Sequence, residues 1–246
     1  MTPVSLHRWP VRLRTGLHPV VLATLCWVNP GAAQTPSATP LQHRAFQRPH
    51  PVVAFDAGVL LMPGADVCLR PENCTDARPS LLLSAWPMYR MSERFAFGAG
   101  LGFGWSPKHE VIDLSSRVPR THSSNIFMAE GTARYLPVTG SVFEAWLGGT
   151  TGFVVLNDRF KIEQNQPEQH FVGESGSSIS SEALAIGLAG GMDWALGSGF
   201  RLGGMLRGAL WFLPSSPKQT ALGDTASLDG VVPIVGFGLT VGYGPE

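Results

Sequence analysis

The chain has 246 residues, a formal net charge of zero, 44% hydrophobic residues and only 15% charged residues. This composition is too apolar for a disordered protein and too neutral for a nucleic-acid-binding protein, so no nucleic-acid partner is expected. No apolar run reaches the roughly 20 residues of a transmembrane helix. No phosphate-binding or cofactor motif is found either, and no cofactor is expected.

The first 33 residues are typical of a secretory signal peptide. Three arginines precede a short apolar stretch, and a helix-breaking NPG with small residues follows it. A basic segment, a short apolar segment and a small-residue cleavage site are the parts of an export signal. We expect cleavage after Ala33, a flexible linker over 34–50 and one folded domain over 51–246.

Two cysteines of the exported chain lie close together in the polar segment DVCLRPENCTD. In an exported protein such a pair is most simply a disulfide, so we expect a bond between Cys68 and Cys74. A zinc site is a poor interpretation, because two cysteines without nearby histidines do not complete one. No metal is expected.

From residue 52 onward, apolar runs alternate with polar ones. Alternation with a period of two predicts extended strands whose side chains point to opposite faces. The clearest case is FAFGAGLGFGW, in which large apolar residues occupy one face and glycines the other. We expect eight strands, over residues 52–62, 80–90, 94–105, 125–136, 141–156, 180–196, 199–213 and 230–243.

The connections between these strands alternate in length. Strands two and three, four and five, and six and seven are joined by the tight turns MSE, PVTG and GSG, and the other connections are long and polar. Short turns at one end and long loops at the other are typical of an antiparallel up-and-down meander. Eight such strands can close into an all-β barrel, which removes the unpaired edges.

The two strand faces decide between a water-soluble and a transmembrane barrel. Eight strands leave an interior just wide enough for side chains, so the large apolar face would overfill it. We therefore expect the Phe95 side to face lipid and the Gly98 side to face the lumen. By the same assignment, Leu101→Arg should block stable insertion and Gly100→Ala should be far milder. A soluble lipocalin-like barrel or sandwich that binds a hydrophobic ligand is the alternative, and it needs the opposite faces.

Strand parity also places eight charged residues on the lumen side. Four acids balance four bases, so we expect ion-paired clusters that plug the barrel rather than a gated pore or a proton path. These residues are Asp56, Arg90, Glu130, Arg134, Glu144, Asp193, Arg201 and Arg207.

The layout resembles the small eight-stranded outer-membrane β-barrels of the OmpA and OmpX type. The resemblance rests on the short turns and long loops, the aromatic-flanked apolar faces and the terminal strand VGFGLTVGYG. It departs at the end, because these proteins usually finish on an aromatic residue that the assembly machinery reads, whereas GPE follows Tyr243 here. The resemblance implies the outer membrane of a diderm bacterium, and contact with outer-membrane lipid and with the barrel-assembly machinery. A monomer is expected.

Three roles are implied by this resemblance: an envelope-stabilising anchor, a surface protein that binds an extracellular ligand through its loops, and a lipid-modifying enzyme. We favour the structural or surface-interaction role. The enzyme alternative rests on THSSN, which is similar to the active-site stretch of outer-membrane lipid A deacylases. His122 shares a strand face with Ser124 and can act as its base. An acid must still orient the histidine, and Glu130 is the nearest carboxylate in the strand.

Overall fold

The computed structural model describes residues 48–70, 73–112, 119–162, 176–216, 218 and 226–244. The expected signal peptide therefore lies outside the described residues. No helix long and apolar enough to cross a membrane occurs in the part of the chain that is described.

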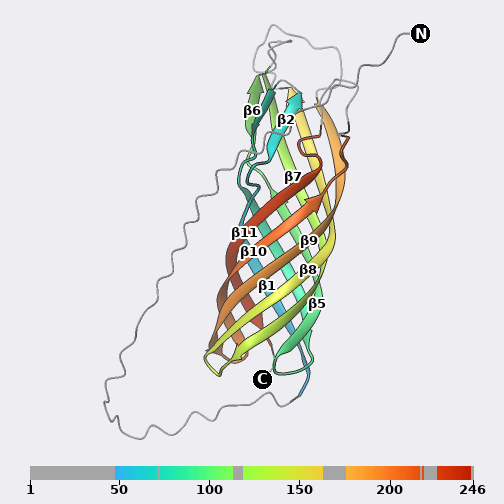
Figure 1. Cartoon of the computed structure of the whole chain (residues 1–246). Coiled ribbons are helices and arrows are strands. Elements are labelled where there is room, and N and C mark those ends of the chain that lie inside the picture. Colours follow the sequence, from blue (N-terminus) through green and yellow to red (C-terminus); the bar gives the residue numbers. More distant parts are fainter. Residues whose placement is uncertain are drawn as a thin grey trace, which may run out of the picture. The chain divides into compact units, whose positions relative to one another are not determined.

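Eight antiparallel strands close into a ring (Figure 1). Each strand pairs with the next strand of the ring along the chain, and the first pairs with the last. The fold is therefore the expected eight-stranded up-and-down barrel. Its strands are β1 (His50–Leu61), β4 (Ser80–Arg90), β5 (Phe95–Trp105), β7 (Pro119–Thr139), β8 (Phe143–Ile162), β9 (Gly176–Gly197), β10 (Phe200–Phe212) and β11 (Val231–Tyr243).

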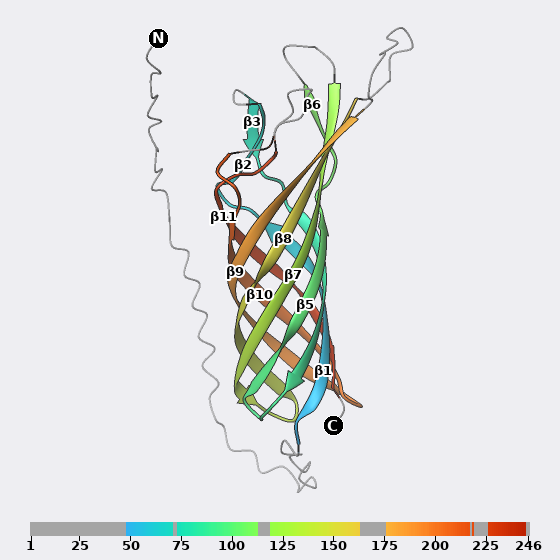
Figure 2. The same cartoon turned by 90° about the vertical axis from the view of Figure 1, so that its right-hand side faces the viewer.

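Three of these strands are longer than the sequence pattern predicts. β7 begins at Pro119, β8 continues to Ile162 and β9 begins at Gly176, so all three extend at the end of the barrel that carries the long connections. Figure 2 shows them projecting beyond the other strands of the ring. Three short strands were not expected: β2 (Asp66–Arg70) and β3 (Asn73–Asp76) form a hairpin, and β6 (His109–Ile112) pairs with the start of β7.

The large apolar residues of the ring point outward on all eight strands. In β5, Phe95 is 56% exposed and Leu101 is 59% exposed, whereas Gly100 between them is buried. A water-soluble barrel would bury this face, so the soluble alternative does not match the structure. We call this outer surface the apolar belt; its members are Phe55, Leu81, Leu83, Tyr89, Phe95, Phe97, Leu101, Phe103, Phe127, Tyr135, Leu147, Phe153, Leu184, Ile186, Leu188, Met192, Trp194, Leu196, Phe200, Leu202, Leu206, Leu210, Phe212, Val231, Val235, Phe237, Leu239, Val241 and Tyr243.

The inward face changes in character along the barrel axis. At the end with the tight turns, the turn end, it carries most of the charged residues. At the opposite end, the loop end, it forms a hydrophobic core that the sequence analysis did not anticipate. Buried members of this core include Leu60, Leu82, Ile126, Val154, Leu156, Trp211, Val232 and Ile234.

Candidate functional site

Three ion pairs join strands that are not neighbours in the ring. Arg207 of β10 binds Glu130 of β7, and both side chains are almost fully buried. Arg90 of β4 donates to both carboxylate oxygens of Glu144 of β8, at 2.8 and 3.2 Å, and Arg201 binds the same carboxylate. Because other strands separate the partners around the ring, these contacts cross the lumen.

The remaining lumen charges surround two tryptophans. The Arg134 guanidinium lies 3.9 Å from the centre of the Trp146 ring and 5.8 Å from that of Trp86, within the range of cation–π interactions. The Trp146 indole donates to Asp193 at 3.1 Å. Asp56 accepts a hydrogen bond from Ser84 at 3.2 Å. All eight charges that parity places inside are thus on the inward face.

A second polar cluster lies at the loop end, where β7 and β8 run beyond the apolar belt. His122 Nε2 lies 3.0 Å from Asp158 Oδ1, and Ser124 Oγ donates to the same oxygen at 2.5 Å. The register explains the contact, because Ser124 is the direct ladder partner of Asp158. His122 also stacks on Phe160, its own ladder partner, with ring centres 4.9 Å apart.

Asp158 additionally fixes a connection between strands. Its Oδ2 accepts the backbone N–H of Ser227 at 2.9 Å, and Ser227 is buried with its neighbours Ala226 and Leu228. Burial opposes ionisation of Asp158. The hydrogen bonds from His122 and Ser124, the charge of His122 and the Ser227 N–H outweigh burial and hold the pKa of this carboxyl below its ordinary value of 3.8.

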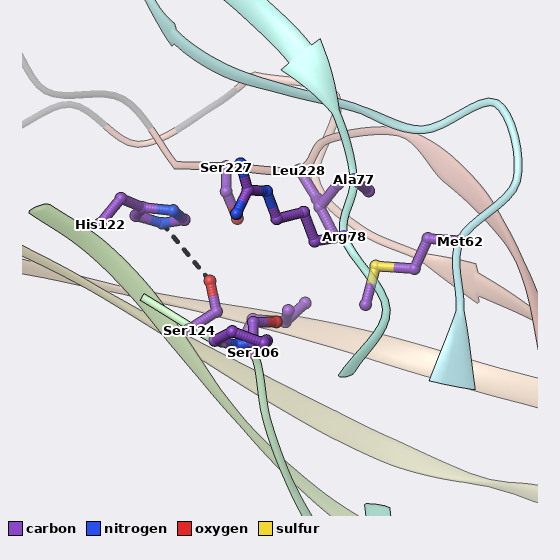
Figure 3. A pocket seen from close by; sticks show the side chains of 10 residues that line it. Met62, Ala77, Arg78, Ser106, His122, Ser124, Ser227 and Leu228 are labelled. Atoms are coloured by element: carbon purple, nitrogen blue, oxygen red, sulfur yellow. Dashed lines mark hydrogen bonds between the residues drawn. The ribbon is translucent and has the colours of Figure 1, made fainter. Parts of the chain in front are cut away.

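A small cavity adjoins this cluster (Figure 3). Its volume of about 30 Å³ is enough for one or two water molecules, since a water needs roughly 10–15 Å³. Arg78 and Ser227 line it on the side opposite Ser124. The other lining residues are Met62, Ala77, Ser106, Pro107, His122, Leu156 and Leu228.

The geometry does not align a serine nucleophile. In a Ser–His–Asp site, the serine faces one imidazole nitrogen and the acid holds the other. Here Ser124 and Asp158 both approach Nε2, with Ser124 Oγ 3.4 Å away, and the serine proton is donated to the carboxylate. Glu130 is not brought to His122, because it lies farther along β7 and binds Arg207. The cluster therefore stabilises a buried carboxylate rather than preparing acyl transfer.

Asp158 is the member of this cluster that the sequence analysis missed. The register of the β7–β8 hairpin contains the information needed to find it. Tyr135 pairs with Leu147 near the turn, and the same antiparallel register, followed away from the turn, pairs Ser124 with Asp158. The predicted strands stop at 125 and 156, so the count ended too early.

The cysteines are placed by backbone register alone: Cys68 and Cys74 are direct ladder partners in the β2–β3 hairpin. No three His, Cys, Asp or Glu side chains of the described residues come together to hold a metal ion.

No protein-family model matches the chain, and no curated protein matches its sequence. Among solved structures, it is similar to Neisserial surface protein A (12% identity, TM-score 0.46, 79% of this chain and 95% of that chain). It is also similar to Ail, the attachment invasion locus protein of Yersinia pestis (11%, 0.41, 80% and 97%). A third similar structure is the outer membrane protein AlkL in DMPC lipid bilayers (13%, 0.39, 86% and 97%).

Proposed function

We propose that the chain is an integral outer-membrane β-barrel with a plugged lumen, exported by its first 33 residues, that acts as a structural or surface-interaction protein through its long loops. The observation that carries the proposal is the apolar belt. In a soluble monomer, the largest exposed apolar patch is about 300–600 Å². The belt instead runs around all eight strands without a break, as a barrel in hydrocarbon requires.

The limits of the belt support a membrane location. Past Phe127 and Leu184, the outward positions at the loop end become polar, with Asn125, Asn157 and Ser180 in one row across β7, β8 and β9. Polar outward positions belong in water, so the belt has a defined edge. The cluster around Asp158 lies beyond this edge, on the side of the long connections.

The lumen contacts support a plugged barrel rather than a pore. Glu130 and Arg207 meet in the middle of the lumen with side chains 1% and 3% exposed. Above them the hydrophobic core fills the loop end. A buried charge is tolerated when an opposite charge pairs with it, and Glu130 and Arg207 neutralise each other, although Glu130 Oε2 and Arg207 Nε have no hydrogen-bond partner among the described residues. The barrel then contributes an anchor, and recognition is assigned to the loops.

Two further parts of the proposal concern the exported chain. Cys68 and Cys74 form a disulfide in the β2–β3 hairpin, which the direct register of the two residues supports. The partners are outer-membrane lipid, the barrel-assembly machinery and an extracellular ligand at the loops, and the barrel is a monomer.

The test is gel mobility of the mature protein extracted from outer membranes in detergent, with and without boiling. We expect the unboiled protein to run faster, because a closed barrel resists the detergent. Recovery in the soluble fraction, with no mobility shift, would overturn the proposal. Conductance in planar bilayers comparable to that of an open porin would overturn the plugged lumen alone.

A further inference from the structure

The outer wall of the barrel is hollowed near its turn end, across β5, β7, β8 and β9. The hollow has a volume of about 410 Å³. Its floor is formed by Ala133, Gly148 and Gly149, and Phe95, Tyr135 and Leu188 are among the residues at its sides. We propose that this groove binds one acyl chain of a phospholipid from the leaflet at the turn end. The inference rests on the proposed membrane location and adds a specific lipid site to it.

The groove exists because side chains are missing from its floor. Gly149 lies on the outward face of β8, and a Cβ placed there would have the Gly187 carbonyl oxygen, 4.0 Å away, as its nearest neighbour. The side chains beside it project outward from the barrel wall: Leu147 is 61% exposed and Leu188 is 73% exposed. The floor of the hollow is therefore backbone, and its sides are formed by the side chains that border it.

An acyl chain suits this groove by chemistry and by size. Phe95, Tyr135, Leu147 and Leu188 at its sides belong to the apolar belt, so the groove opens toward hydrocarbon under the proposed function. Its volume falls within the roughly 300–1,000 Å³ typical of small-molecule sites. Phe95 and Tyr135 pack against each other at its turn end, with ring centres 5.2 Å apart. A tyrosine at this depth combines an apolar ring with a polar tip, as membrane interfaces favour.

The charge next to the groove indicates a lipid with a phosphate. Arg94 is exposed in the turn and directly precedes Phe95. Its carbonyl accepts the N–H of Leu136 at 2.8 Å, which holds the turn next to Tyr135. The nearest carboxylate in sequence, Glu93, accepts a hydrogen bond from Thr139. A phosphate above the groove would thus meet a guanidinium at the level where a headgroup lies.

The experiment is native mass spectrometry of the mature barrel in detergent, titrated with phosphatidylglycerol. Gly149→Leu fills the floor of the groove. Gly204→Leu is the matched control, because it adds the same side chain to the outward face of β10, where a Cβ has no atom nearer than 3.7 Å. We expect the wild type and Gly204→Leu to bind one phospholipid more tightly than any further ones, and Gly149→Leu to bind that lipid about tenfold more weakly.

A second variant tests the headgroup. Arg94→Gln should weaken binding of phosphatidylglycerol and leave binding of diacylglycerol, which lacks the phosphate, unchanged.

Equal lipid binding by Gly149→Leu and the wild type would overturn the site. A wild-type dimer that Gly149→Leu dissociates would overturn it too, because a second copy of the chain would then fill the groove. The boiling-dependent mobility shift is measured for the wild type and for each variant. If the wild type shows no shift, the proposed membrane location is wrong. If the wild type shows the shift and Gly149→Leu binds lipid as the wild type does, only the proposed lipid site is wrong.

Discussion

The two ends of the lumen are closed by different interactions. At the loop end, buried Leu, Ile, Val and Trp side chains pack against one another and need no specific partner. At the turn end, buried charges are held by specific partners: Glu144 binds Arg90, and the Trp146 ring lies against Arg134. Apolar packing tolerates exchange of one residue for another of similar volume. A buried ion pair is much less tolerant, because removal of one member leaves the other uncompensated.

The largest effect is expected where the two kinds of closure meet. Glu130→Leu leaves the Arg207 guanidinium buried without its carboxylate, which should cost about 3–5 kcal/mol. The double variant Glu130→Leu with Arg207→Met replaces the pair by apolar side chains and should regain most of this loss. Urea unfolding of the barrel in lipid vesicles measures both. If the double variant were as unstable as Glu130→Leu, loss of the charge partner would not be the cause of the instability. The contrast drawn between the two ends of the lumen would then be wrong.

The outer wall gives the next largest effect. Leu101→Arg places a charge on the apolar belt and should destabilise the inserted barrel by about 2–4 kcal/mol, whereas Leu101→Met should change stability little. Partitioning between membranes and aggregates is the measurement. The structure changes the expectation for Gly100→Ala, because a Cβ at Gly100 would overlap the Trp86 ring. That substitution is not mild, and similar losses for Gly100→Ala and Leu101→Arg would no longer argue against the face assignment.

The loop-end core should respond weakly to a change that keeps its volume. Leu60→Ala opens a cavity at a position that is 1% exposed and should cost about 2–5 kcal/mol. Leu60→Met keeps the volume and should cost less than about 1.5 kcal/mol. The same urea measurement applies. If Leu60→Met cost as much as Glu130→Leu, the loop end would be no more tolerant than the turn end.

The smallest effect concerns pH at the edge of the loop end. The pKa of folded Asp158 lies below its ordinary value of 3.8, so its ionised form stabilises the folded state above that value. This stabilisation is lost as the pH falls through the lowered pKa. Hydrogen exchange, corrected for intrinsic rates, should show the Ser227 amide protected at pH 6 and progressively less protected as the pH falls below 3.8. Asp158→Asn should lower its protection at pH 6 by about 1–2 kcal/mol, without affecting the Leu213 amide, which is bonded to Gly230.

The fold was predictable because a membrane-type pattern is repeated in every strand. In β5, the alternation of aromatic residues with glycines sets both the strand and its faces. The ends of β7, β8 and β9 were not predictable from this pattern. Beyond the apolar belt the outward residues become polar, so the start of β7, with outward residues such as Thr121 and Ser123, has the pattern of a loop. The hydrogen-bonded ladder nevertheless continues there.

The candidate sites divide in the same way. Parity within single strands was enough to place the lumen charges on the inward face. Their partners were not predictable, because Glu130 and Arg207 meet across the ring rather than along a strand. The cluster of His122, Ser124 and Asp158 required the exact register of one hairpin, together with a connection that folds back onto it. Amino-acid composition determines neither the register of the hairpin nor the path of the connection.

The cross-lumen pair of Glu130 and Arg207 also affects how the barrel assembles. Its two charges belong to β7 and β10, which no single hairpin contains. In a flat sheet, β8 and β9 would hold the two charges apart, so neutralisation of the pair favours curling of the sheet into the ring. Formation of the pair is thereby coupled to the curvature of the whole wall, and the two charges stay hydrated until the sheet curls and brings them together.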